Sequence, residues 1–379
     1  MNSQVIIPSL LFICLGVLNA LLEKSLYQQE ALGLPKYGVH KCSKPHFFCS
    51  IGFAGMGCAV FFYILMTKLW PSKFESIKKV SWKQFSEFLI PATFDLMQGT
   101  MSSVTIAFVG LSFDYMMRCG TLVGVTIIAK IYFKKKFHTY QWVAIGIIIS
   151  ALIIIGLSSM ILADQSSTIN VPPKVALSII FLKFLAQFCY SIKLSYEQYF
   201  SQDIKLNPTL VVGLEGSLST LMEFLIVLPI VHFLPGEEGN GIHEDFFDTI
   251  EMMKNSKTVL ILMLSGMVWC GVYNVFAVSL TEASSAVTRT LLESFRTFII
   301  WGIQIAIFYI CSSSESLKKY SSLGEEWCKG SFLQLGGYIV MIIGILLYYG
   351  HPRILISNKR SKKNLNEYIR IESEPNDDM

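Results

Sequence analysis

Three charged residues at helical spacing interrupt one long apolar run near the end of the chain. Arg289, Glu293 and Arg296 stand at positions i, i+4 and i+7, which places them on one face of an α-helix. A charge in hydrocarbon costs at least about 2.5 kcal/mol, so this face is expected to meet a polar cavity or a partner. Its guanidinium groups are suited to bind an anionic part of a ligand, or to change carboxylate partners between two conformations. A self-neutralised structural network is the alternative.

Two carboxyl groups lie inside other apolar runs without a base on their own helix. Asp95 and Glu215 have no Lys or Arg three or four residues away, so each must find a partner on another helix or bind a proton. Glu223 shares the run of Glu215, but Asp95 and Glu215 are the better candidates. A carboxyl that binds a proton would suit proton coupling, whereas an interhelical salt bridge would be only structural. The sequence leaves both readings open.

Further polar residues within the apolar runs fall into two groups. Asp114 stands four residues before Arg118, and Lys193 four residues before Glu197, a spacing that favours ion pairs along one helix. We assign Asp114, Lys193 and Glu197 to structural ion pairs. The residues expected to bind a substrate or to couple its movement are Asp95, Gln98, Arg118, Lys183, Glu215, Asn274, Arg289, Glu293 and Arg296.

The elements that must hold these residues are predicted to be membrane-spanning helices. Of the 379 residues, 53% are hydrophobic and only 15% charged, which is too apolar for an ordinary soluble domain. Apolar stretches of about 18 residues or more recur, each long enough as a helix to cross the hydrocarbon of a bilayer. They lack the alternation of a β-barrel strand. The ten predicted spans are 5–27, 47–69, 87–110, 113–133, 141–163, 175–200, 208–234, 258–280, 284–311 and 332–350.

The ten spans are expected to form two repeats. Each half contains a tight hairpin and ends with a polar helix (113–133 or 284–311) followed by a glycine-rich apolar helix (141–163 or 332–350). Because five spans per repeat is an odd number, the second repeat would be inverted in the membrane. We therefore predict a first repeat over 1–163, a linker over 164–174, a second repeat over 175–350 and a disordered charged tail over 351–379. The Lys and Arg residues of 68–86, 130–140 and the tail favour cytosolic termini.

The sequence lacks the signatures of several other classes of protein. It contains no His-Glu-x-x-His, Gly-x-Ser-x-Gly or Gly-x-x-x-x-Gly-Lys motif, so we expect no enzyme activity, no metal, no cofactor and no ATP-driven transport. The net charge of +4 is spread over loops and tail, which gives nucleic-acid binding no support. Most of the nine cysteines lie in apolar runs. Cys311 and Cys328 bracket a polar loop and would form a disulfide only if that loop faces an oxidising lumen.

The order and spacing of several polar blocks resemble the drug/metabolite transporter superfamily, in particular the solute carrier 35 family, subfamily F, member 6-like branch. These blocks are Pro91–Asp95, Met117–Gly120, Gln141–Trp142, Tyr196–Glu197, Leu214–Gly216, Tyr273–Asn274, Ala286–Arg289, Glu293–Thr297 and Trp301. The resemblance implies ten helices in two inverted repeats around a central cavity, with hairpins as gates. It also implies relatives among nucleotide-sugar and chloroquine-resistance-like transporters. A lysosomal or vacuolar membrane is the favoured location, with Golgi or endoplasmic reticulum as the alternative, and Tyr368–Ile371 has the form of a sorting signal.

The sequence therefore predicts a gradient-driven or exchanging transporter of a small polar metabolite, such as a nucleotide sugar, with protons as the candidate coupling ion. In this hypothesis Arg289 and Arg296 compensate Asp95, Glu215 or a substrate anion, and Arg118 holds the opposite hairpin. A non-transporting membrane scaffold or receptor is the alternative. Acidic and basic residues within the spans balance, so charge does not name the substrate. The sequence gives no indication of the oligomeric state.

Overall fold

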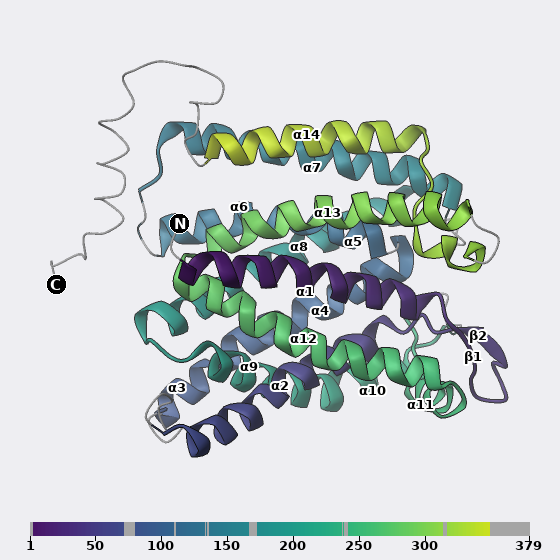
Figure 1. Cartoon of the computed structure of the whole chain (residues 1–379), viewed down its shortest axis with the longest axis horizontal. Helices are drawn as coiled ribbons and strands as arrows, with labels where there is room; N and C mark the ends of the chain where they lie inside the picture. The colour runs from purple at the N-terminus through teal and green to yellow at the C-terminus, as the bar shows by residue number, and fades with distance from the viewer. Residues whose placement is uncertain are drawn as a thin grey trace, which may run out of the picture.

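Long helices that run side by side make up most of the protein (Figure 1). The computed structural model describes residues 3–71, 80–109, 111–132, 134, 136–166, 173–236, 238, 242–313 and 317–348. Seven helical segments in this part of the chain are long and apolar enough to cross a membrane. The fold is therefore that of an α-helical, multi-pass membrane protein. The predicted tail over 351–379 and most of the predicted linker lie outside the described residues.

A helix coincides with each of the ten predicted ranges. The seven candidate spans contain α1 (Ser3–Tyr27), α2 (Pro45–Leu69), α8 (Pro173–Gln198), α9 (Pro208–Met222) with α10 (Leu228–Phe233), α12 (Lys257–Ala283), α13 (Ala286–Ser312) and α14 (Lys329–Tyr348). The other three ranges hold α4 (Leu89–Val109), α5 (Leu111–Met117) with α6 (Thr121–Ile131), and α7 (Thr139–Ser166). Within the described residues, none of these three meets the length and the hydropathy required of a candidate span together. The number of ten spans thus remains a prediction.

Polar residues in front of the helices fix where the site-bearing helices begin. The side chain of Asn207 accepts a hydrogen bond from the backbone N–H of Thr209 at 3.0 Å, with Pro208 at the first position of α9. Ser285 accepts from the N–H of Thr288 at 3.2 Å in front of α13. Such caps satisfy donors that the first turn leaves free, and proline costs nothing at that position. They therefore set the positions of the charged residues one to two turns further on.

Two of the predicted helices are interrupted rather than continuous. A 3₁₀ turn, η2 (Arg118–Gly120), separates α5 from α6. A π-helical turn, η4 (Glu223–Val227), separates α9 from α10, and the N–H of Leu228 donates to the carbonyl of Glu223. Pro229 follows at once and has no N–H to continue the α-helical ladder, which explains a break at this place. Both interruptions lie next to charged side chains.

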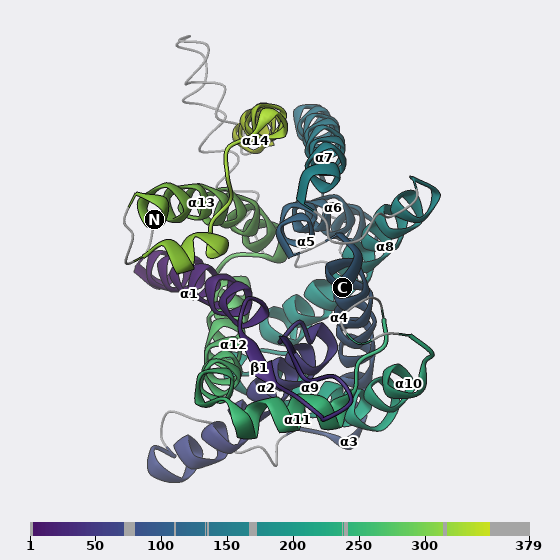
Figure 2. The ribbon, with the colours of Figure 1, turned by 90° about the vertical axis from the view of Figure 1, so that its right-hand side faces the viewer.

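The polar connections 28–46 and 235–257, which the sequence left as loops, contain regular structure. The first holds the antiparallel strands β1 (Glu30–Leu32) and β2 (Val39–Lys41), with Ala31 opposite His40. The second holds helix α11 (Phe246–Asn255), capped by Asp245. The two segments lie together at one end of the helices (Figures 1 and 2). We call them the polar cap.

Glycines allow α2 to touch its two neighbours through the backbone. A Cβ on Gly55 would collide with the carbonyl oxygen of Met267 on α12, and one on Gly216 of α9 would collide with Met56. Small residues at helix crossings let backbones approach closely in this way. Helix α2 is therefore held tightly between α9 and α12.

Replacing Gly55 with leucine should consequently prevent the packing of α2 on α12. The colliding partner is backbone, so no rotamer change can relieve it, and we expect a loss of at least about 3 kcal/mol, at the upper end for overpacked sites. Gly146 on α7 is the matched control, because a Cβ there meets nothing within 4 Å. Thermal unfolding of the two purified variants checks this. Equal melting temperatures for Gly55→Leu and Gly146→Leu would contradict the packing described.

Candidate functional site

Buried charges from four helices meet in the interior of the helix bundle. We call this group the central cluster. It consists of Asp95 on α4, Lys193 and Glu197 on α8, Glu215 on α9, and Arg289, Glu293 and Arg296 on α13, together with Tyr190 and Tyr273. All seven charged side chains are almost completely buried. A cluster of this kind within a membrane bundle marks a functional site by default.

Lys193 joins three of these helices through one ammonium group. Its Nζ atom lies 3.2 Å from Oδ2 of Asp95, 3.2 Å from Oε1 of Glu197 and 3.5 Å from Oε1 of Glu215. Lys193, rather than Arg289 or Arg296, thus forms the direct ion pairs of Asp95 and Glu215 in this structure. The reason is geometric: α4 packs along α8 and brings Asp95 to Lys193, a contact that spacing within one helix cannot reveal. The predicted pair of Lys193 with Glu197 is present, but within the cluster.

Arg289 extends the network from Glu197 to the aromatic side chains. Its Nη1 atom donates to Oε2 of Glu197 at 2.6 Å, and Nη2 donates to the hydroxyl of Tyr190 at 3.2 Å. Tyr190 in turn donates to Oε1 of Glu293 at 3.0 Å. The predicted stripe on α13 is thus linked to α8, and the i,i+4 contact between Arg289 and Glu293 is longer, at 4.0 Å.

Arg296 differs from the other cations of the central cluster. It donates to the hydroxyl of Tyr273, and its guanidinium carbon lies 5.4 Å from the ring centroid of Phe12 on α1. Among the described residues it forms no ion pair with a carboxylate, and its Nε atom has no hydrogen-bond partner. A buried guanidinium held by aromatic rings is suited to receive an anionic group from a ligand.

The charges of the central cluster do not balance. Asp95, Glu197, Glu215 and Glu293 supply four carboxyl groups, whereas Lys193, Arg289 and Arg296 supply three cations. Neither oxygen of Glu215 has a hydrogen-bond partner among the described residues. The excess negative charge of the cluster is costly in such buried surroundings, so the arrangement favours the uptake of one proton or one cation. Because Lys193 has three acceptors in reach, it can also exchange partners when one is neutralised.

A second buried group lies around Asp114. Its carboxylate accepts from Lys183 of α8 and from Nε of Arg118, which is 3.3 Å away. Lys183 also donates to the hydroxyl of Ser102 at 2.6 Å, and Gln98 donates to the same oxygen at 2.9 Å. The predicted i,i+4 pair is therefore present with Lys183 as a third member. Arg118 pairs along its own segment rather than holding a second hairpin.

Glu23 on α1 belongs beside this group and was not among the predicted residues. Its carboxylate accepts hydrogen bonds from the hydroxyls of Tyr115 at 2.6 Å and Tyr27 at 3.1 Å, and the side chain is buried. From the sequence it reads as a charge at a span end, where water would solvate it. The i,i+4 spacing of Glu23 and Tyr27 was the available signal.

The pair of Asp114 and Lys183 is expected to be structural, and two variants test this. Lys183→Met should leave the buried carboxylate of Asp114 with only the 3.3 Å contact to Arg118, and should destabilise the protein by up to about 3–5 kcal/mol. The double variant Asp114→Asn with Lys183→Met removes one charge of each sign from the buried pair and should recover most of that loss. Melting temperatures of the purified variants measure both effects. A double variant no more stable than Lys183→Met would contradict the pairing.

Two of the predicted features do not join either group. Asn274 donates to the carbonyl of Cys270 on its own helix at 2.9 Å, so it acts along α12. Cys311 and Cys328 are free thiols, and no disulfide joins them. Cys311 lies in the last turn of α13, whereas the thiol of Cys328 lies 3.6 Å from the hydroxyl of Ser331 at the start of α14. A disulfide between them thus stays a prediction that is conditional on an oxidising lumen.

The fold and the buried charges together define a multi-pass membrane protein with a polar centre, the class to which solute transporters belong. No family model matches the chain. Solute carrier family 35 member F6 of Rattus norvegicus is 23% identical over 353 residues, which cover 92% of this chain and 89% of the relative. The protein of the same name from Homo sapiens is 23% identical over 71% of this chain and 68% of its own length. An uncharacterised protein of Schizosaccharomyces pombe is 23% identical over 78% and 84%, respectively.

These relatives confirm the resemblance to the solute carrier 35 family, subfamily F, over most of the chain. The mammalian relatives are named as solute carriers. A protein of known crystal structure has a similar fold, with a TM-score of 0.52 and 11% identity over 90% of this chain and 98% of its own.

Proposed function

We propose that the protein is a secondary transporter that moves a small polar solute by alternating access around the central cluster. The observation that carries this proposal is Lys193, which shares one ammonium group among carboxyl groups of three helices. Neutralising any one of them, by a proton or by a bound solute, shifts Lys193 towards the other two. Such a change of partners would move α4 relative to α8 and α9. The cluster can thus link binding to a change of helix packing.

The helix contacts support ten spans in two inverted repeats. If the halves are equivalent, α1, α2, α4, α6 and α7 correspond to α8, α9, α12, α13 and α14, and each contact should recur between the corresponding helices. The contact of α4 with α8 recurs as that of α12 with α1, and the contact of α6 with α8 recurs as that of α13 with α1. The contact of α4 with α9 recurs as that of α12 with α2. The pairs α2 with α9 and α7 with α14 map onto themselves. Helices α7 and α14 lie side by side at the edge of the bundle (Figure 2), and the residues of the central cluster lie on other helices. We propose that α4, α5 with α6, and α7 supply the remaining three spans.

The chemistry of the cluster suggests what is carried. Arg296 lacks a carboxylate partner among the described residues and lies between aromatic rings, so an anionic solute such as a nucleotide sugar is the first substrate class to test. The excess carboxyl group suggests that protons supply the driving force. An endomembrane is the proposed location, lysosomal or vacuolar rather than Golgi or endoplasmic reticulum, with both termini in the cytosol.

Reconstitution into liposomes tests the proposed function. The purified protein should take up at least one member of a panel of nucleotide sugars, nucleotides, amino acids, peptides and organic cations, faster with an inward proton gradient. Liposomes without protein are the control. If no member of the panel enters under any gradient, a non-transporting scaffold or receptor becomes the better account.

A further inference from the structure

One buried carboxyl group outside the central cluster, that of Glu223, has no hydrogen-bond partner among the described residues. Glu223 is 0% exposed, and neither of its oxygens accepts a hydrogen bond from a described residue. It lies within the apolar segment Pro208–Phe233, two helical turns after Glu215. A bare carboxylate in such surroundings is costly, whereas the neutral acid is not. The position therefore favours a side chain that carries a proton.

The backbone at this place is also unusual. Glu223 is the first residue of the π-helical turn that ends at Val227, and its carbonyl accepts from the N–H of Leu228. π-turns in α-helices occur frequently at functional sites, because they shift the side chains on one helix face. The irregular turn thus coincides with the unpaired acid.

The charged neighbours of Glu223 are all acidic. Its charge interacts with those of Asp95 on α4 and Glu244 before α11, and it also acts on the thiol of Cys49 on α2. No cation among the described residues contributes. Asp95 belongs to the central cluster, whereas Glu244 belongs to the polar cap. Glu223 therefore stands between the two polar regions of the protein.

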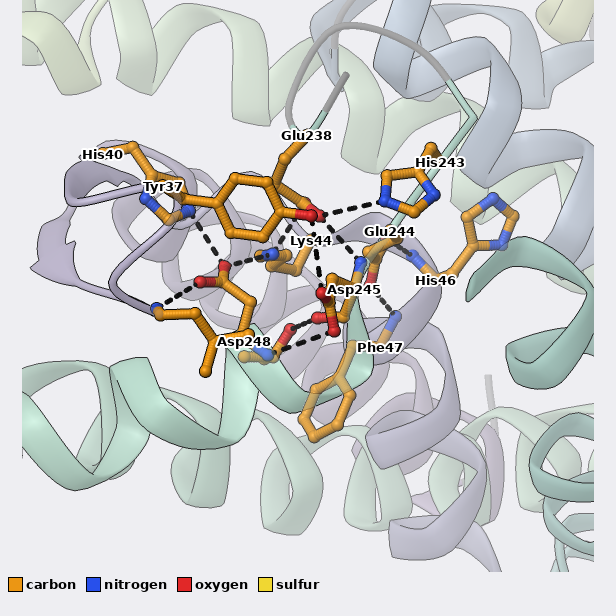
Figure 3. A network of polar contacts seen from close by, with 12 residues as sticks. Tyr37, His40, Lys44, His46, Phe47, Glu238, His243, Glu244, Asp245 and Asp248 are labelled. Carbon is orange, nitrogen blue, oxygen red and sulfur yellow. Dashed lines mark hydrogen bonds and ion pairs between the residues drawn. The ribbon is translucent and has the colours of Figure 1, made fainter. Parts of the chain in front are cut away.

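Glu244 lies outside the membrane spans, in the polar cap, and would connect Glu223 and Asp95 to that end of the protein. Its two oxygens accept from the backbone N–H groups of His46 at 3.0 Å and Phe47 at 2.7 Å, in the first turn of α2 (Figure 3). Burial raises the pKa of Glu244 to about 7, although these hydrogen bonds and the charge of Lys44 oppose the rise. Glu244 can therefore gain and lose a proton near neutral pH.

Several other charged groups of the cap are already paired with one another. Lys44 lies 2.6 Å from Glu238 and 2.7 Å from Asp248, and Asp248 also accepts from Nε2 of His40 at 3.0 Å (Figure 3). His46 is the exception, because it is buried and neither ring nitrogen has a partner among the described residues. Among the described buried groups of the cap, Glu244 is thus the one that can take up a proton near neutral pH.

We propose that Glu223 is a proton-binding site that links the polar cap to the central cluster. The proton arrives from the cap side, converts the carboxylate of Glu223 to the neutral acid, and leaves to Asp95 when the cluster changes partners. This inference rests on proton-coupled transport as the proposed function. It adds the residue through which the proton would enter.

Infrared spectroscopy tests the proton on Glu223 without any substrate. In purified protein at neutral pH, the carbonyl band of protonated carboxylic acids should lose one component in Glu223→Gln. Glu251→Gln is the matched control, because Glu251 lies on α11, outside the spans, paired with Lys254 at 3.1 Å. It should leave the band unchanged. A band identical in wild type and Glu223→Gln overturns the proposal.

Flux in liposomes then tests the link. In the wild type and in Glu251→Gln, an inward proton gradient should speed uptake. In Glu223→Gln, the ratio of flux with the gradient to flux without it should fall to about one. Glu223→Asp should restore part of the response to the gradient. A full response of Glu223→Gln to the gradient overturns the link even if the infrared component is lost. If uptake by the wild type does not respond to the gradient, the link between Glu223 and transport is also overturned. In that case the infrared result shows separately whether Glu223 holds a proton.

Discussion

Replacing Lys193 with methionine should abolish solute flux, by at least about a hundredfold, a factor that corresponds to about 2.7 kcal/mol. Methionine keeps most of the length of the side chain but removes the charge that three carboxyl groups share. Glu197 retains Arg289, whereas Asp95 and Glu215 are left without a cation and should take up protons. The protein should therefore fold, with a lower melting temperature, but lose the change of partners. Flux in liposomes and thermal unfolding measure the two effects.

A matched variant and a neutral variant separate a functional from a structural role of Lys193. Lys254→Met removes an exposed lysine outside the spans, paired with one carboxylate, and should transport as the wild type does. The triple variant Lys193→Met, Asp95→Asn and Glu215→Gln leaves no uncompensated charge, so its stability should recover. It should still not transport. Restored flux in the triple variant would mean that the three residues only hold the helices together.

Replacing Arg296 with methionine should weaken the binding of an anionic solute without stranding a carboxylate. A hydrogen-bonded charged contact contributes about 1.5–3 kcal/mol, so the apparent affinity should fall by about 10- to 100-fold. Arg289→Met is the comparison, because its loss removes the 2.6 Å contact to Glu197. We expect Arg289→Met to lower the melting temperature much more than Arg296→Met.

The same two variants can also contradict the assignment of Arg296 to substrate binding. Concentration-dependent uptake gives the apparent affinity, and thermal unfolding gives the stability. If Arg296→Met transports with unchanged affinity, the guanidinium serves only to pack against Phe12 and Tyr273. Lysine at this position should not restore affinity fully, because it lacks the planar fork of donors.

Long apolar runs made the helices of this fold predictable, because hydrophobicity is a property of the local sequence. The described helices lie within two or three residues of most predicted boundaries. The interruptions were missed at Arg118–Gly120 and at Glu223–Val227, since they depend on backbone hydrogen bonds at individual turns. The hairpin and α11 were also missed, because their short polar segments are held by contacts between distant parts of the chain, such as Lys44 with Asp248.

The sequence indicated which residues belong to the candidate site better than it indicated the contacts between them. A charged residue within an apolar run indicated a polar site, and this signal identified Asp95, Glu215 and Arg289 as candidates. Their partners lie on other helices, however, and spacing along one helix reveals only pairs such as Lys193 with Glu197. Lys193 was therefore assigned to a local pair, although it is the group on which the cluster converges. Its place depends on α4, which packs along α8 and also contacts α9.

Counterflow in liposomes tests the central claim most directly, because it requires a substrate site that faces each side in turn and needs no net driving force. Vesicles loaded with an unlabelled solute should accumulate the labelled solute transiently when they contain the wild-type protein. Vesicles with Lys193→Met should not. Equal counterflow by the two proteins would contradict a transport mechanism built on the central cluster, and the absence of counterflow from the wild type for every solute of the panel would contradict transport itself.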